Sequence, residues 1–288
     1  MDITQTAGLP LSVTLLVLLA AMAHASWNAI AHGVNDKLAA MTLFALGGGL
    51  FAVPLLFLAP APDGSSWPYL IASVIVHIAY NLLLMTAYRL GDFSQMYPLA
   101  RGSAPLVVTL LAAVFVNEVP PPLELVGVVV VSVGLGSLVL VGGRPHRHEL
   151  PAIAAALATG LTIATYTVID GTGVRRSGSP GGYFGWLMIL NGVVIVAYAA
   201  ARRGPALIGQ LRTSAVPGLI GGALSLAAYG LVLWAQTRGA LAPISALRET
   251  SIIVGAIIGA WIFKEGFGPR RIAATAIVLA GVMLINLG

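Results

Sequence analysis

Residues 97–118 read YPLARGSAPLVVTLLAAVFVNE, and residues 244–265 read ISALRETSIIVGAIIGAWIFKE. Both segments have an arginine near the start, an apolar run and a final glutamate, and they are 147 residues apart. A second set of matches is 149 residues apart, so a two-residue deletion separates the two sets. Because both offsets are close to half of the 288 residues, the chain reads as an internal duplication. The matching pairs are Pro68 with Pro217, Ala79-Tyr80 with Ala228-Tyr229, Arg89 with Arg238, Arg101 with Arg248, Glu118 with Glu265 and Gly134 with Gly281.

The composition of the chain is that of a membrane protein. Hydrophobic residues make up 58% and charged residues only 9%, whereas a soluble domain has roughly 25% charged residues. In lipid every backbone polar group must find an internal partner, so the spans are helices or strands of a closed barrel. The long apolar runs lack the period-two alternation of barrel strands. The sequence therefore predicts an all-α polytopic membrane protein.

Proline, glycine and charged residues divide the chain into ten expected transmembrane helices, most near the roughly 20 residues that cross the hydrocarbon core. The linker 142–148 is the most polar stretch, and it separates a first repeat (1–145) from a second repeat (146–288). Because each repeat holds five spans, the second is expected to be inverted relative to the first. The spans are 10–33, 38–59, 68–90, 94–117, 123–141, 149–170, 182–201, 213–237, 241–263 and 269–287.

Positive charge in the short loops gives the expected orientation. Ten Lys and Arg residues flank one set of loops and three flank the other, which places the first set in the cytoplasm and both termini outside. The first span is expected to be retained, because no Lys or Arg precedes it as a signal peptide requires. The first set is Lys37, Arg89, Arg144, Arg147, Arg202, Arg203, Arg212, Lys264, Arg270 and Arg271, and the second is Arg175, Arg176 and Arg238.

The basic balance and the absence of cysteine restrict the partners. The net charge of +5 and pI of about 9.8 are better explained by anionic lipid headgroups than by nucleic acid, because the basic residues lie between apolar spans. With no cysteine, thiolate metal sites and iron–sulfur clusters are excluded. We expect no cofactor, no metal and a monomer in the cytoplasmic (inner) membrane.

Ten helices in two inverted five-helix repeats, with Glu118 and Glu265 after the fourth span of each half, resemble the drug/metabolite transporter superfamily of the EamA type. The chain is also similar to YddG-type exporters of aromatic and other amino acids. The resemblance implies an exporter of amino acids or related metabolites, with a central cavity, alternating access and no ATP site. It supplies no motif that assigns substrate ligands, which therefore come from the residues themselves.

Polar and aromatic residues within spans are the candidate lining of that cavity, because polar groups in the membrane must face protein or water. In two spans they share one helix face at spacings i, i+3 and i+4. The alternative is that they join helices by hydrogen bonds or anchor in the headgroup region. The expected substrate-binding residues of this kind are His24, Trp27, Asn28, His77, Tyr80, Asn81, Tyr97, Tyr166, Tyr229 and Trp234.

Arg101 and Arg248 complete the expected substrate site. Each lies about seven residues inside its span, roughly 10 Å deep, where an uncompensated arginine costs about 2.5–3.5 kcal/mol. A planar guanidinium binds a carboxylate through two hydrogen bonds, which suits an amino-acid substrate. The alternatives are a snorkelling arginine or one tied to Tyr97, backbone carbonyls or Glu249.

Few titratable groups lie inside the spans to couple transport to protons. Glu249 and His77 are the expected candidates, with His24 as a third. Glu118 is expected to be structural, pairing with a helix N-terminus or a loop arginine, and Asp170 is expected near a span end, where water reaches it. A uniporter therefore stays as plausible as a proton antiporter.

Glycine and proline give two expectations about helix geometry. Prolines are expected to kink two spans: Pro98, Pro105 and Pro243. Glycines are expected to permit close helix packing: Gly47-Gly48-Gly49, Gly255 and Gly259.

Three other functions are alternatives to an amino-acid exporter. A multidrug exporter of lipophilic cations would need a deep acidic residue, and Glu249 is the one expected. A channel would show a selectivity ring or an oligomeric pore. An intramembrane enzyme would show a Walker A loop, an H-E-x-x-H motif or a paired acid site, and the sequence has none of these, so we expect no enzymatic activity.

Overall fold

The computed structural model describes residues 9–34, 36–90, 93–137, 149–262 and 269–287. Within them the first half of the chain forms five long helices and one short 3₁₀ turn. Their bounds agree with the expected spans to within a few residues, because the apolar runs and their proline and glycine ends determine both. They are α1 (Leu11–Gly33), α2 (Lys37–Leu58), η1 (Gly64–Ser66), α3 (Trp67–Leu90), α4 (Phe93–Phe115) and α5 (Pro122–Ser137).

The second half departs from expectation at three places. Helix α6 continues to Arg176 instead of ending at 170. A short extra helix, α8, follows α7, and the span expected at 241–263 is two helices rather than one. The helices are α6 (Leu150–Arg176), α7 (Pro180–Arg203), α8 (Ala206–Thr213), α9 (Ala215–Gln236), α10 (Leu241–Arg248), α11 (Ser251–Ile262) and α12 (Pro269–Leu287).

Within the described residues, six helices are long and apolar enough to cross a membrane, which is consistent with a polytopic membrane protein. They are α1, α2, α3, α6, α7 and α9, and shorter apolar helices lie in α4, α5 and α12. Helix α6 is the most enclosed of the six, with 56% of its apolar window buried against 28–33% in the others. It therefore forms the centre of the bundle.

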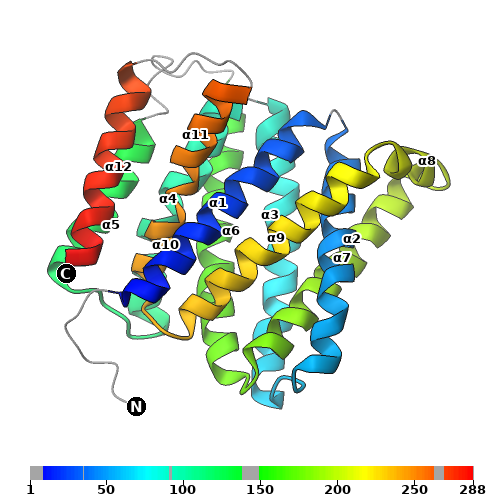
Figure 1. Cartoon of the computed structure of the whole chain (residues 1–288), viewed down its shortest axis with the longest axis horizontal. Coiled ribbons are helices and arrows are strands. Elements are labelled where there is room, and N and C mark those ends of the chain that lie inside the picture. Colours follow the sequence, from blue (N-terminus) through cyan, green and yellow to red (C-terminus); the bar gives the residue numbers. More distant parts are fainter. Residues whose placement is uncertain (1–8, 35, 91–92, 138–148, 263–268, 288) are drawn as a thin grey trace.

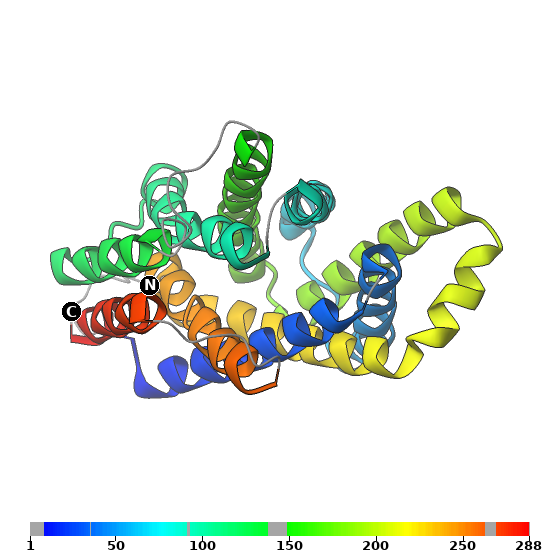
Figure 2. The same cartoon turned by 90° about the horizontal axis from the view of Figure 1, so that it is seen from above.

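The main helix contacts join the first half of the chain to the second. Helix α3 packs on α6, α2 on α7, α5 on α12 and α1 on α9. Figures 1 and 2 show α5 and α12 side by side at one edge of the bundle, and α7 and α9 projecting at the opposite edge. The first turn of α1 and the last turn of α12 lie at the same end (Figure 1).

Close helix contacts depend on glycine between α2 and α9 and between α5 and α12. A Cβ on Gly47 of α2 would lie 3.3 Å from the Cα of Gly222 on α9, as expected for a packing glycine. A Cβ on Gly127 of α5 would lie 2.7 Å from the carbonyl oxygen of Gly281 on α12. The prediction for Gly255 was wrong, because a Cβ there would meet open space.

The break between α10 and α11 lies at Glu249–Thr250, whereas a kink was expected at Pro243. Pro243 occupies the first turn of α10, where its missing N–H does no harm. At the break the amides of Glu249 and Thr250 bond to the carbonyls three residues earlier, and the Thr250 hydroxyl donates to the carbonyl of Leu247 at 2.8 Å. The chain therefore tightens and ends the α-helix at its most polar point.

Candidate functional site

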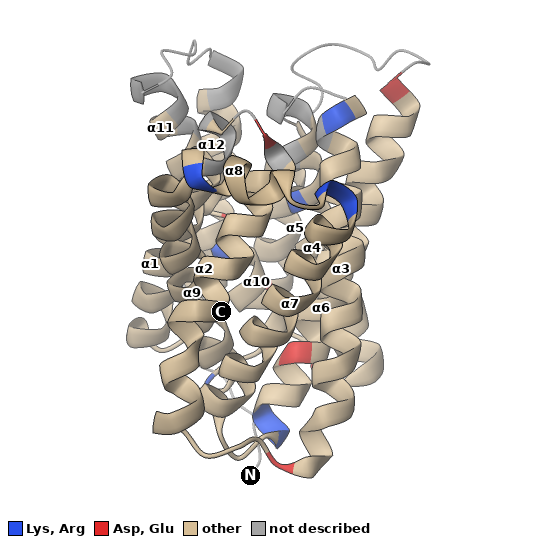
Figure 3. Ribbon diagram, turned by 90° about the vertical axis from the view of Figure 1, so that its right-hand side faces the viewer, with Lys and Arg blue, Asp and Glu red and all other residues tan. Residues whose placement is uncertain are grey.

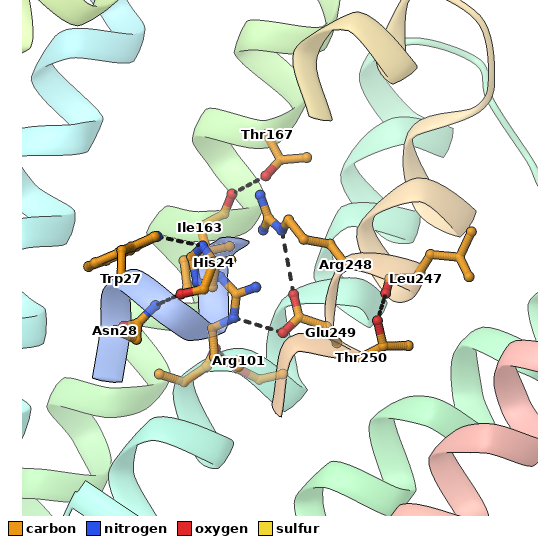
Figure 4. A network of polar contacts seen from close by, with 12 residues as sticks. His24, Trp27, Asn28, Arg101, Ile163, Thr167, Leu247, Arg248, Glu249 and Thr250 are labelled. Atoms are coloured by element: carbon orange, nitrogen blue, oxygen red, sulfur yellow. Dashed lines mark hydrogen bonds and ion pairs between the residues drawn. The ribbon is translucent and has the colours of Figure 1, made fainter. Parts of the chain in front are cut away.

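Among the residues that Figure 3 colours, the charged ones lie mainly toward the two ends of the bundle, and few lie between them. Three of these inner residues form one cluster, with Arg101 on α4 and Arg248 and Glu249 at the end of α10. Nε of Arg101 donates to Oε2 of Glu249 at 2.7 Å, and Nε of Arg248 lies 3.7 Å from Oε1 of Glu249. Figure 4 shows Glu249 between the two guanidinium groups. All three are almost fully buried, with 3% exposure or less.

The charges in this cluster do not balance. Two guanidinium groups face one carboxylate, because the repeat register places Gly102 where the second half has Glu249. A Cβ on Gly102 would already lie 2.7 Å from that of Leu135, so no larger residue fits there. Among the described residues, Nε and Nη2 of buried Arg248 have no hydrogen-bond partner. The described part of the cluster therefore holds one more positive than negative charge.

A histidine group from α1 borders this cluster (Figure 4). The indole N–H of Trp27 donates to Nδ1 of His24 at 3.2 Å, so this nitrogen carries no proton. The side-chain amide of Asn28 donates to the carbonyl of His24 at 2.8 Å. Both arginines act electrostatically on His24, so the three expected residues of α1 adjoin the charged cluster.

A second group, of aromatic rings, surrounds α6. The ring of His77 stacks on Tyr166 with centroids 4.1 Å apart, and it meets Tyr80 and Tyr229 edge-on at 6.4 and 5.6 Å. The side-chain amide of Asn81 donates back to the carbonyl of His77 at 2.8 Å. The expected residues His77, Tyr80, Asn81, Tyr166 and Tyr229 are thus brought together by α3, α6 and α9.

Asp170 lies at the base of this aromatic group, contrary to the expectation that water reaches it. Helix α6 continues to Arg176, and Asp170 is 0% exposed. Its carboxylate accepts hydrogen bonds from the hydroxyls of Tyr183, at 2.9 Å, and of Tyr229. The Ser73 side chain also acts on this carboxylate. The statement that Glu249 is the one deep acid is therefore wrong.

The charge of Arg248 links the two groups, since it acts electrostatically on His24, His77 and Tyr229. Two expected substrate-binding residues, Trp234 and Tyr97, are not placed in either group. Trp234 packs on the apolar core beside α1 and holds Arg238 over its ring at 5.0 Å. The side chain of Tyr97 lies outside the described residues.

An ion pair between Glu118 and Arg175 holds the loops before α5 and α10. Glu118 pairs with Arg175 and accepts from the backbone N–H of Leu241 at 3.0 Å, so its expected structural role is confirmed. Arg175 also donates to the carbonyls of Gln236 at 2.6 Å and Gly239 at 2.7 Å. Glu265, which is the repeat counterpart of Glu118, lies outside the described residues, as does the linker 142–148.

The segment from α6 to α12 is similar to a known protein family. Residues 150–287 match the EamA-like transporter family. This EamA match begins at the first residue of α6 and ends at the last residue of α12. It includes Asp170, Tyr229, Arg248 and Glu249, whereas His77 and Arg101 lie outside it.

Two further similarities extend the EamA match. A chloroplastic WAT1-related protein of Arabidopsis thaliana is 25% identical over 107 residues, which are 35% of this chain and 26% of that protein. The chain thus aligns with about a quarter of that relative. A solved crystal structure aligns with a TM-score of 0.77 over 96% of this chain and 98% of the other, at 16% identity. That likeness concerns the fold.

Proposed function

We propose that the protein is a secondary transporter of the EamA-like family that moves small molecules across a membrane. The family match to the second half and the apolar helices support this proposal. So does the broken helix α10–α11, since transporter sites are commonly built where a membrane helix is interrupted near the midplane. At Glu249 the break brings charged groups from both halves together.

The proposed architecture is ten spans in two inverted repeats, 1–145 and 146–288, that alternate access to a cavity between them. A twofold operation exchanges α1 with α6 and α3 with α9. Under it the α3–α6 contact becomes the α9–α1 contact, while the α2–α7 and α5–α12 contacts map onto themselves. All four contacts occur in the fold, which supports the proposal.

The proposed substrates are amino acids, aromatic and other neutral ones, or related metabolites, exported across the cytoplasmic membrane. The observation that carries this substrate class is the buried guanidinium of Arg248, whose Nε and Nη2 have no hydrogen-bond partner among the described residues. A substrate carboxylate would satisfy both atoms and balance the second arginine charge. Arg101 has a different proposed role. It pairs with Glu249 and positions the Glu249 carboxylate, and it does not bind substrate.

The aromatic group is proposed to receive the substrate side chain. The rings of His77, Tyr80, Tyr166 and Tyr229 offer apolar faces next to polar edges. His24, Trp27, Asn28 and Asn81 are proposed to border the same space. Direction of transport rests on the family resemblance.

A proteoliposome assay tests this function. Labelled tryptophan, phenylalanine and threonine are offered with a quaternary-ammonium drug as competitor, to the native protein and to Arg248→Met and Arg212→Gln variants. Arg212 is exposed near the end of α8 and serves as the matched control. We expect saturable amino-acid flux that Arg248→Met reduces at least tenfold and Arg212→Gln leaves within twofold.

Two results would overturn the assignment. Equal flux in the Arg248→Met protein, with the fold intact, removes the carboxylate site. Flux of the drug without flux of amino acids replaces the substrate class by lipophilic cations, for which buried Asp170 among aromatic rings is the matching acid.

A further inference from the structure

We propose that Asp170 is the residue that binds a coupling proton, with His77 and Ser73 as its connection to the substrate region. The inference rests on the proposed transport function, because a coupling proton has meaning only in a carrier. Glu249 and His77 were the candidates expected from the sequence. The contacts of the two buried acids favour Asp170 over Glu249.

Glu249 is neutralised by arginine and Asp170 is not. Protonation of Glu249 would remove the negative charge to which Arg101 donates at 2.7 Å and beside which the buried Arg248 lies, which is strongly unfavourable. Asp170 is also 0% exposed, but among the described residues it forms no ion pair and its hydrogen-bond partners are hydroxyl groups. Protonation there removes a lone buried charge, so Asp170 exchanges a proton at the lower cost.

The hydroxyl donors come from two different helices. Tyr183 lies on α7 and Tyr229 on α9, while Asp170 lies on α6. A charged carboxylate accepts both bonds, whereas a carboxylic acid must itself donate one. Gain of a proton therefore weakens the attachment of α6 to one of its neighbours. This contact change is how proton binding would bias the two states of the carrier.

His77 provides the connection to the substrate region. Its Nδ1 lies 3.0 Å from the carbonyl oxygen and 3.1 Å from the hydroxyl of Ser73, one turn earlier on α3. The Ser73 side chain also acts on the Asp170 carboxylate, so Ser73 lies between His77 and Asp170 in this polar group. The titratable and charged groups that face this polar group are Tyr166 on α6, Tyr183 on α7, Tyr229 on α9 and Arg248 on α10.

The experiment separates coupling from transport in proteoliposomes. Exchange of labelled for unlabelled amino acid is measured with equal pH on both sides, and concentrative uptake is measured under an imposed pH gradient. Asp170→Asn keeps the shape of the side chain without its proton chemistry. We expect its concentrative uptake to fall at least tenfold and its exchange rate to become independent of pH. Asp36→Asn, which changes an acid before α2, is the matched control and should keep both properties.

A second variant covers the case in which Asp170→Asn does not fold. Tyr183→Phe removes one hydroxyl donor, and Tyr183 is not one of the rings proposed to meet substrate. Loss of a donor to a charged group favours protonation, so the pH of half-maximal exchange should rise by about one unit.

The possible failures are distinguishable. If the native protein gives no saturable flux, the transport proposal fails. If it transports but ignores the pH gradient, or if Asp170→Asn keeps its gradient response, the carrier stands and Asp170 loses its role. An unchanged pH profile in Tyr183→Phe likewise overturns the inference.

Discussion

Gly127 of α5 and Gly281 of α12 occupy reciprocal positions at one helix interface. A Cβ on Gly127 would lie 2.7 Å from the carbonyl oxygen of Gly281, and a Cβ on Gly281 would lie 2.8 Å from that of Gly127. The atoms that a new Cβ would meet on either helix include backbone atoms, so neither helix can make room by changing a side-chain conformation. The interface depends on both residues being glycine.

Substitution of Gly281 by alanine should therefore destabilise the protein by about 1–3 kcal/mol, the usual range for overpacking. Gly136→Ala on the same pair of helices is the control, because a Cβ there meets open space, and alanine favours helix by about 1 kcal/mol. Thermal unfolding in detergent, followed by tryptophan fluorescence, measures both. A Gly281→Ala protein as stable as native would contradict the close contact.

The arginine–glutamate cluster predicts an asymmetry between its members. Glu249→Gln removes the carboxylate that lies against two buried guanidinium groups and should cost about 3–5 kcal/mol. Arg101→Met leaves Glu249 with Arg248 and should cost less. The double variant should recover part of the Glu249→Gln loss, because it removes one of the two guanidinium charges.

Denaturant unfolding of the two single variants and the double variant provides the test. Asp63→Asn, in the loop before η1, is the control. Strict additivity of the two single losses would mean that Arg101 and Glu249 do not depend on one another.

Adjacent arginines at the end of α6 should differ in importance. Arg175 binds Glu118 and two backbone carbonyls of the loop before α10, whereas Arg176 contacts Tyr69 at a more exposed site. Because charged hydrogen bonds to buried carbonyls are worth about 1.5–3 kcal/mol each, Arg175→Gln should destabilise by about 2–3 kcal/mol. Arg176→Gln should change stability by less than about 1 kcal/mol.

Trypsin gives a local measurement of the same contact. Exposed Arg238 lies in the loop that Arg175 holds, so cleavage after Arg238 should accelerate in Arg175→Gln and stay near native in Arg176→Gln. Equal cleavage in both variants would show that the loop is held by other contacts.

The Asp36–Arg203 pair predicts a small pH dependence. The hydrogen bond from Arg203 holds the pKa of the Asp36 carboxyl below its usual value of 3.8. A lowered pKa in the folded state stabilises the fold above the unfolded value, and this contribution is lost as pH falls through the folded pKa. Asp36→Asn should cost under about 1 kcal/mol at pH 7, because water screens the pair, and nothing at pH 2. A difference that persists at pH 2 would contradict the assignment.

The helix bounds could be predicted because apolar runs and their terminal residues act locally. The break at Glu249–Thr250 could not, because no glycine or proline marks it and the partner of Glu249 lies 148 residues away. Asp170 was missed for a related reason. The sequence places the end of that span at 170, whereas α6 continues to Arg176 with Asp170 satisfied by tyrosines of α7 and α9.

The length of chain between Arg101 and Glu249 has a consequence for biosynthesis. At about 5–20 residues per second, the ribosome delivers Glu249 roughly 7–30 s after Arg101. During that time α4 carries a positive charge whose counter-ion has not been synthesised. Helix α4 must wait at the translocon or near the membrane surface, and its final position is secured only when the last quarter of the chain arrives.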